Sequence, residues 1–321
     1  MKRLQRKRLG RLLSAVLVGT ASLGMVSCGP SDSSSTSSSS TADSAADSTT
    51  EETLTLGAIP DQDPEKLQRQ YEKLSTYLSE ELGVPVEYKP VTDYAAAVTG
   101  FKTGDLELVW FGALTGVQAR LQVPGAEAIA QREIDTQFKS VFIANTAAGV
   151  PELSSVEDLV ALKGKTFTFG SESSTSGRLM PQAFLEQAGV SLEDFKGKPG
   201  FSGDHDKTIK VVEAGSYEVG ALSTSVWTKR TEAGEVDLDK VNLILETPTY
   251  FNYHWVLNPT LKQQFGDDIG ERILAAFEKL DPSNPDHAEI LDLFAAEKFI
   301  PTTNENYDDV ESVGRSIGKI R

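Results

Sequence analysis

Short apolar strands alternate with amphipathic helices along most of the chain. Residues 54–59 have the apolar pattern of a strand, and Asp63 followed by Pro64 predicts the start of a helix that Gly83 ends. The alternation continues to about residue 144 and begins again after residue 155. A chain of this kind is expected to form an α/β fold with largely parallel sheets. Two such units predict two lobes, with ligands bound beyond the carboxyl ends of their strands.

A loop rich in serine and threonine, residues 173–177, joins a predicted strand at 166–169 to a predicted helix at 178–188. Small hydroxyl side chains at the start of a helix accept hydrogen bonds from its unpaired backbone N–H groups. The same N–H groups, together with the positive end of the helix dipole, can instead hold an anion. The loop alone leaves both interpretations open: a capped helix, or half of an anion-binding cleft.

Two reactive motifs are excluded at this loop. A Walker A phosphate loop requires Gly, four residues and then Gly-Lys-Ser/Thr, but Gly170 and Gly177 are too far apart. The Gly-x-Ser-x-Gly pattern of a nucleophile elbow is also absent there. Two further strand-to-helix loops, residues 203–206 and 223–225, have similar polar chemistry in the same predicted lobe. The three loops together favour an anion-binding site over an ordinary helix cap.

Residues 1–27 have the features of an export signal. Six lysine and arginine residues precede an apolar run at 12–26, which is too short for an ordinary membrane span. Cys28 follows this run, and the arrangement resembles a bacterial lipoprotein signal, in which the cysteine becomes the lipidated first residue. The alternative is a plain secretory signal with an incidental cysteine. Because Cys28 is the only cysteine, an intrachain disulfide and a cysteine metal site are excluded.

Residues 28–53 are rich in serine, threonine, alanine and aspartate, with too few large apolar residues to form a core. We expect a flexible tether between a lipid anchor and a folded body, which places the protein in the periplasm, held at the cell envelope. Removal of the signal would change the formal charge from −16 to −22. Such a body would repel nucleic acid, so no nucleic-acid partner is expected. An anion site in it requires local donors and helix dipoles to set the potential.

Five short stretches stand out in the folded body. They are residues 91–94 (VTDY), 105–112 (DLELVWFG), 173–177 (SSTSG), 202–205 (SGDH) and 217–222 (YEVGAL). In their order and spacing, the chain from about residue 54 to 320 resembles the periplasmic binding proteins of ABC importers for phosphonate, phosphite and related oxyanions. The run GSESSTSGRLMP at 170–181 resembles most closely a subgroup assigned to selenate binding.

The resemblance implies an α/β fold of the two-lobed periplasmic-binding-protein type II, with a ligand cleft between lobes that close on the ligand. Lobe 1 would comprise residues 54–143 and 248–321, and lobe 2 would comprise residues 144–247. The run of residues 174–176 would hold the oxyanion, His205 would donate to it, and Tyr94 would close over it. The full set of implied ligand-binding residues is Tyr94, Thr115, Ser174, Thr175, Ser176, His205 and Ser223.

Two positions depart from the family pattern. Phosphonate and phosphite binders usually carry an aspartate where Ser223 stands. A carboxylate accepts a hydrogen bond from a protonated oxyanion, whereas a serine can also donate to a fully ionised one. We therefore expect a selenate- or sulfate-like ligand, with phosphite, phosphonate or phosphate as the alternative, in which a neighbouring acid replaces the aspartate. Gly116 stands where many relatives have a tyrosine, which predicts a differently shaped pocket on that side.

Structural roles remain open for several of these residues: His205 could cap its helix, Tyr94 could belong to the core, and His254 is expected to be structural. The expected function is a solute receptor that docks, once closed, on the permease subunits of an ABC importer. A ligand sensor of the same fold is the alternative. An enzyme is not expected, because three histidines and one cysteine provide no visible nucleophile with a base partner. We expect no cofactor and no metal ion, and a monomer held at the membrane by its lipid anchor.

Overall fold

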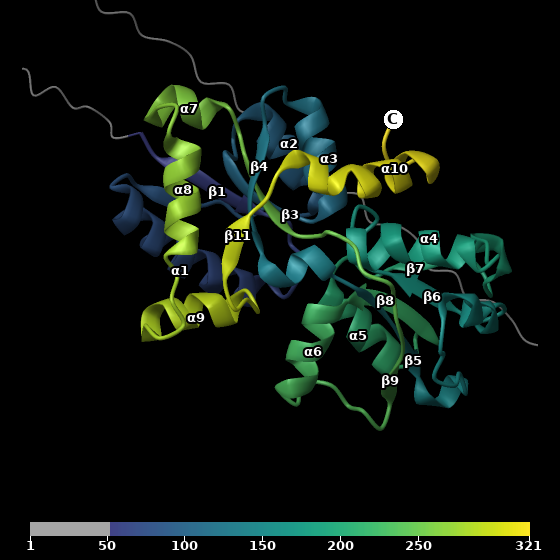
Figure 1. Ribbon diagram of the computed structural model, residues 1–321. Coiled ribbons are helices and arrows are strands. Elements are labelled where there is room, and N and C mark those ends of the chain that lie inside the picture. The colour runs from purple at the N-terminus through teal and green to yellow at the C-terminus, as the bar shows by residue number, and fades with distance from the viewer. Residues whose placement is uncertain (1–51) are drawn as a thin grey trace, which may run out of the picture. The chain divides into compact units, whose positions relative to one another are not determined.

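The structure, a computed structural model, describes residues 52–321, which belong to one compact unit (Figure 1). The expected signal peptide, the expected lipidation site Cys28 and nearly all of the expected tether lie outside the described residues. Among the helices of the described part, none is long and apolar enough to cross a membrane.

A six-stranded sheet with strand order β11-β4-β10-β3-β1-β2 forms the centre of the first lobe (Figure 1). Its strands are β1 (Leu54–Ala58), β2 (Val86–Tyr88), β3 (Leu108–Phe111), β4 (Glu127–Arg132), β10 (His254–Leu257) and β11 (Phe299–Pro301). Its helices are α1 (Pro64–Leu82), α2 (Tyr94–Thr103), α3 (Ala113–Gln122), α7 (Thr260–Phe265), α8 (Ile269–Glu278), α9 (Pro285–Leu293) and α10 (Asp308–Ser316). Helix α1 packs with α8 and α9, while α3 packs with α2 and α10.

A five-stranded sheet with strand order β7-β6-β8-β5-β9 forms the centre of the second lobe. Its strands are β5 (Ser140–Asn145), β6 (Phe167–Phe169), β7 (Gly200–Phe201), β8 (Val219–Ser223) and β9 (Val241–Glu246). Its main helices are α4 (Met180–Gln187), α5 (His205–Glu213) and α6 (Thr224–Glu232). A π-helical turn, η4 (Thr175–Leu179), leads directly into α4. Residues 156–162, before β6, form a 3₁₀ helix, η3 (Val156–Leu162).

The prediction of largely parallel sheets is only partly right. Strand β1 runs parallel to β2 and β3, and β6 runs parallel to β7 and β8. Strands β5 and β10 run antiparallel to both of their neighbours. The register explains why: β5 begins at Ser140, opposite the last residue of β8, and β10 begins at His254, opposite the last residue of β3. Each of these strands enters its sheet at the edge where the parallel strands end, because the chain arrives there from the other lobe.

The chain passes between the two sheets twice. It leaves the first sheet after β4 and returns to it between β9 and β10. All of β5 pairs with β8 and β9, so the predicted lobe boundary at residue 143 falls inside a strand of the second sheet. The first crossing therefore lies before Ser140. The second lies between Glu246 and His254, a segment that contains the predicted boundary at residue 248.

The bounds of helix α1, whose start contacts the second lobe, follow from its local sequence. Asp63 caps it by accepting from the N–H groups of Glu65 and Lys66, and Gly83 ends it with φ of +69°. The apolar residues at helical spacing are buried against the sheet, namely Leu67, Tyr71, Leu74 and Leu78. These features confirm the predicted helix. They fix the start of α1, and with it residues 61–63, beside the edge where β1 ends.

Candidate functional site

Six polar side chains gather where the strands of the two sheets end. Asp61, Tyr94 and Tyr253 come from the first lobe, whereas Ser174, Ser176 and His205 come from the second; all six are no more than 4% exposed. Contacts link them across the lobes: His205 Nε2 lies 3.3 Å from the Tyr253 hydroxyl and 3.5 Å from Ser176 Oγ. The Tyr253 hydroxyl also lies close enough to Asp61 to lower the pKa of its carboxyl group. We call these six residues the polar cluster.

His205 is oriented as a hydrogen-bond donor. Its Nδ1 lies 3.4 Å from the backbone N–H of Ser223, which can only donate, so Nδ1 must accept. In the neutral ring the proton then resides on Nε2, the atom that faces Tyr253 and Ser176. Burial lowers the pKa of His205 to about 4, so the ring is neutral at pH 7. Asp204 caps helix α5 through the N–H of Lys207, so the His205 ring is not needed as a cap.

The run of residues 174–176 supplies both a helix cap and free donors. Ser174 Oγ accepts from Gly177 N at 2.9 Å, which is the cap that the sequence allowed. Thr175 Oγ1 accepts from Leu114 N at 2.8 Å, a contact between the lobes. Each hydroxyl keeps its own proton for donation, and the first N–H groups of a helix have no intrahelical acceptor. Capping and anion binding are therefore compatible here, because different atoms of the same loop can do each.

Asp61 is the member of the cluster that sequence reasoning missed. Asp61 is 4% exposed, and burial raises the pKa of its carboxyl group to about 6, although the Tyr253 hydroxyl and the Arg132 charge act in the opposite direction. Arg132 is itself held by Asp135 through bonds of 2.6 and 2.8 Å, so it does not form an ion pair with Asp61. Its place in the sequence could have indicated a site residue, because Asp61 follows β1 at the edge of the sheet where ligands of such sheets bind.

Two tyrosines of the first lobe, Tyr94 and Tyr253, belong to the polar cluster. The Tyr94 hydroxyl is buried beside Ser174 but forms no hydrogen bond of ordinary geometry within the described residues. Tyr253, which sequence reasoning also missed, stacks on Trp110 with ring centroids 5.6 Å apart and an interplanar angle of 10°. Burial raises the pKa of both tyrosines, so both keep their protons and can donate. An aromatic-rich crossing segment at 247–255 was the only sequence signal for Tyr253.

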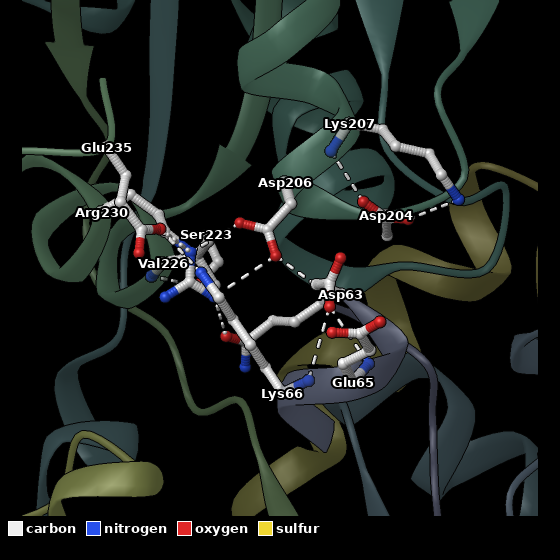
Figure 2. A network of polar contacts seen from close by, with 11 residues as sticks. Asp63, Glu65, Lys66, Asp204, Asp206, Lys207, Ser223, Val226, Arg230 and Glu235 are labelled. Carbon is white, nitrogen blue, oxygen red and sulfur yellow. Dashed lines mark hydrogen bonds and ion pairs between the residues drawn. The ribbon is translucent and has the colours of Figure 1, made fainter. Parts of the chain in front are cut away.

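Two predicted site residues direct their hydroxyl groups elsewhere. Thr115 Oγ1 donates to the carbonyl of Gly112 at 3.0 Å, within the first turn of α3. Ser223 Oγ accepts from Val226 N at 3.4 Å (Figure 2), so it caps α6. It also bonds Ser225 Oγ at 2.9 Å. Only the backbone N–H of Ser223 faces the polar cluster, through His205. The structure therefore brings together Tyr94, Ser174, Ser176 and His205 of the predicted set, with Thr175 adjacent.

Gly116 packs against the ring of His254, a role that its difference from the tyrosine of many relatives did not indicate. A Cβ atom at this position would lie 2.4 Å from the ring of His254, which stacks on Tyr307 with ring centroids 3.7 Å apart. We expect Gly116→Ala to lower the free energy of unfolding by about 1–3 kcal/mol, because the buried ring has no room to move. Chemical denaturation measures the loss. Gly270→Ala is the control: its Cβ would meet only ordinary contacts, so its stability should equal or exceed that of the wild type.

No group of three or more His, Cys, Asp or Glu side chains between residues 52 and 321 is arranged to hold a metal ion. The polar cluster instead combines hydroxyl, imidazole and backbone N–H donors with one carboxyl group, that of Asp61. Such an arrangement suits a small oxyanion with one proton to donate.

Two α/β lobes joined by two crossings, with a buried polar site at their strand ends, define a ligand-binding protein of the periplasmic type. Residues 56–307 match the sequence model of the family described as ABC transporter, phosphonate, periplasmic substrate-binding protein. The chain belongs to this family of substrate-binding proteins.

Individual relatives support this assignment. The chain is 46% identical over 269 residues to the probable ABC transporter phosphite binding protein PhnD1 of Prochlorococcus marinus. The matched region covers 84% of this chain and 91% of PhnD1. The fold is similar to the structure of that PhnD1 in complex with methylphosphonate, with a TM-score of 0.82 and 46% identity. The match covers 84% of this chain and 99% of the PhnD1 chain. The chain is 27% identical over 281 residues to the phosphate-import protein PhnD of Mycolicibacterium smegmatis, covering 82% of this chain and 85% of that protein.

Proposed function

We propose that the protein is the extracytoplasmic substrate-binding component of an ABC importer and that it binds phosphite or a small phosphonate such as methylphosphonate. The observation that carries this proposal is the Asp61 carboxyl group, buried among the donors of the polar cluster. The PhnD1 relative, with its phosphite-binding description and its methylphosphonate complex, supports the same ligand class.

The protonation state of the ligand determines which hydrogen bonds it can form in the site. A singly protonated phosphite or phosphonate can donate its P–O–H group to the Asp61 carboxylate. Its remaining oxygens then accept from His205 Nε2, from the hydroxyls of Ser174 and Ser176, and from N–H groups at the start of η4. With a dianionic ligand, the same arrangement forms if Asp61 takes up one proton, which its pKa of about 6 facilitates. In both cases the ligand and Asp61 share a single proton.

This chemistry argues against our expectation of a selenate- or sulfate-like ligand. That expectation depended on Ser223, whose hydroxyl caps α6 and does not face the polar cluster. The neighbouring acid that the alternative required is present as Asp61. Sulfate and selenate carry no proton near neutral pH, so they could bind only after Asp61 takes up a proton, and their weakly basic oxygens would share that proton less strongly than those of phosphite. The comparisons support the phosphite and phosphonate alternative and give no support to selenate or sulfate.

The remaining features of the proposal concern the protein's surroundings. We infer that the closed form docks on permease subunits, that the protein is a monomer, and that it has no catalytic activity of its own. Cys28 would anchor it in the cell envelope after removal of the signal, with the tether allowing the body to reach the permease.

Isothermal titration of the folded body with five anions tests the ligand class. We expect phosphite and methylphosphonate to bind with micromolar or tighter affinity, which corresponds to about 8 kcal/mol or more. Sulfate and selenate are expected to bind at least about tenfold more weakly, because neither brings a proton to Asp61 and both are weaker acceptors than phosphite for the proton of a neutral Asp61. Phosphate has an additional hydroxyl that needs its own partner, so it is expected between these groups. Sulfate or selenate binding more tightly than phosphite would refute the proposal.

A further inference from the structure

Beside the polar cluster, a second set of contacts joins the start of α1 to helices α5 and α6. Figure 2 shows Asp206 at its centre, between Arg230 and Asp63. One oxygen of Asp206 accepts from Arg230 Nε at 2.6 Å, and the other accepts from the backbone N–H of Asp63 at 2.9 Å. Arg230 Nη2 also donates to Gln62 Oε1 at 2.8 Å. Two residues of the second lobe thus hold two residues of the first.

These contacts are shielded from solvent. The side chains of Asp206 and Arg230 are 9% and 6% exposed, so salt screens their interaction only weakly. The Asp206 carboxylate also faces the first turn of α1, where the helix dipole favours a negative charge. The ion pair of Lys66 with Glu235 spans the lobes at 2.7 Å as well, but its side chains are 30% and 47% exposed. An exposed pair of this kind is expected to contribute little.

The same two chain segments carry candidate ligand groups and these interlobe contacts. Asp61 lies next to Gln62, and His205 lies next to Asp206. The backbone N–H of His205 donates to the carbonyl of Asp61 at 3.0 Å, which joins the two segments directly. Separation of the lobes would therefore break the polar cluster together with the contacts of Asp206 to Asp63 and of Arg230 to Gln62.

We propose that Asp206 and Arg230 form a latch that stabilises the closed arrangement and tightens ligand binding without touching the ligand. The inference rests on the proposed function, in which the lobes open and close around an oxyanion. The bond between Asp206 and Arg230 lies within the second lobe, so it persists when the lobes separate. Of the contacts made by Asp206 and Arg230, those to Gln62 and Asp63 are the ones that form on closure. A contact that is made only in the closed state adds its free energy to ligand binding.

A double-mutant cycle on Gln62 and Arg230 tests the latch. Gln62→Ala removes the acceptor, and Arg230→Lys keeps the charge beside Asp206 but loses the fork that reaches Gln62. Each change is expected to raise the Kd for phosphite by about five- to tenfold, mainly through faster dissociation. The double variant should bind no more weakly than the single variants, because both remove the same contact. Gln68→Ala is the matched control, since Gln68 on α1 bonds Glu72 of its own helix and, within residues 52–321, no side chain of the second lobe.

The thermal midpoint of the ligand-free protein separates a latch from a merely structural role. A latch predicts that Gln62→Ala leaves this midpoint unchanged and lowers only the midpoint measured with phosphite. Wild-type affinity in Gln62→Ala, or an equal loss of stability with and without phosphite, would overturn the latch.

If the wild type binds no tested anion, the proposed function fails and X-ray scattering still tests the latch. The closed arrangement would then depend on the protein's own contacts. Gln62→Ala should therefore have a larger radius of gyration than the wild type, and equal radii would overturn the latch.

Discussion

Replacement of Asp61 with asparagine is expected to have opposite effects on binding and on stability. The Kd for phosphite should rise at least about tenfold, because the charge-assisted bond to the ligand's P–O–H group is lost. The free energy of unfolding at pH 8 should rise by up to about 3 kcal/mol, since the wild type then buries an ionised carboxylate. If the ionised Asp61 stabilised the fold, Asp61→Asn would instead lower the free energy of unfolding.

The pH dependence of stability follows from the direction of the shift. The pKa of Asp61 is about 6 in the folded protein and 3.8 in the unfolded chain, so the folded state binds the proton more tightly. Stability attributable to Asp61 is therefore highest below pH 3.8 and falls as the pH rises through 6. His205, whose folded pKa is lowered to about 4, has the opposite effect over a similar range. The difference between the wild type and Asp61→Asn isolates the contribution of Asp61.

Urea denaturation at pH 4, 5, 6, 7 and 8 measures this difference. The stability advantage of Asp61→Asn should grow across the series and level off above about pH 7. An advantage that does not change with pH would show that Asp61 is not ionised at the site, and unchanged phosphite affinity would show that it does not meet the ligand.

The double replacement Ser174→Ala with Ser176→Ala is expected to weaken phosphite binding by at least about tenfold, because two donors to the oxyanion are lost together. Ser174 also caps the turn through Gly177 N, so stability should fall by about 1 kcal/mol, well short of unfolding. Calorimetric titration and urea denaturation measure the two effects.

The neighbouring residue provides the control for this loop. The Ser173 hydroxyl forms none of the hydrogen bonds found in residues 52–321, so Ser173→Ala should bind phosphite as the wild type does. If the double variant also kept wild-type affinity, the loop would be only a helix cap and the site would have to lie elsewhere.

Local sequence patterns predicted the parts of the fold that local chemistry determines. The bounds of α1 follow from Asp63, Pro64 and Gly83, each of which acts within a few residues of itself. The serine and threonine loop at 173–177 was likewise predicted as a strand-to-helix connection. The directions of β5 and β10 were not predicted, because they depend on where the chain crosses between lobes, which periodicity does not record.

The candidate site was predicted less completely for the same reason. The chemistry of Asp61 depends on burial against residues far along the chain, such as His205 and Tyr253, and nothing near Asp61 in the sequence indicates it. Ser223 shows the converse error. It stands at the end of β8 as expected, but a serine at a helix start readily turns its hydroxyl to the backbone, and here it caps α6.

The most direct test of a shared proton between Asp61 and the ligand is the number of protons taken up on binding. Calorimetric titration with phosphite at pH 8, in two buffers of different ionisation enthalpy, measures it. At this pH both phosphite and Asp61 are mostly deprotonated, so the account predicts an uptake close to one proton in the wild type and close to zero in Asp61→Asn. Tight binding by the wild type without proton uptake would contradict it.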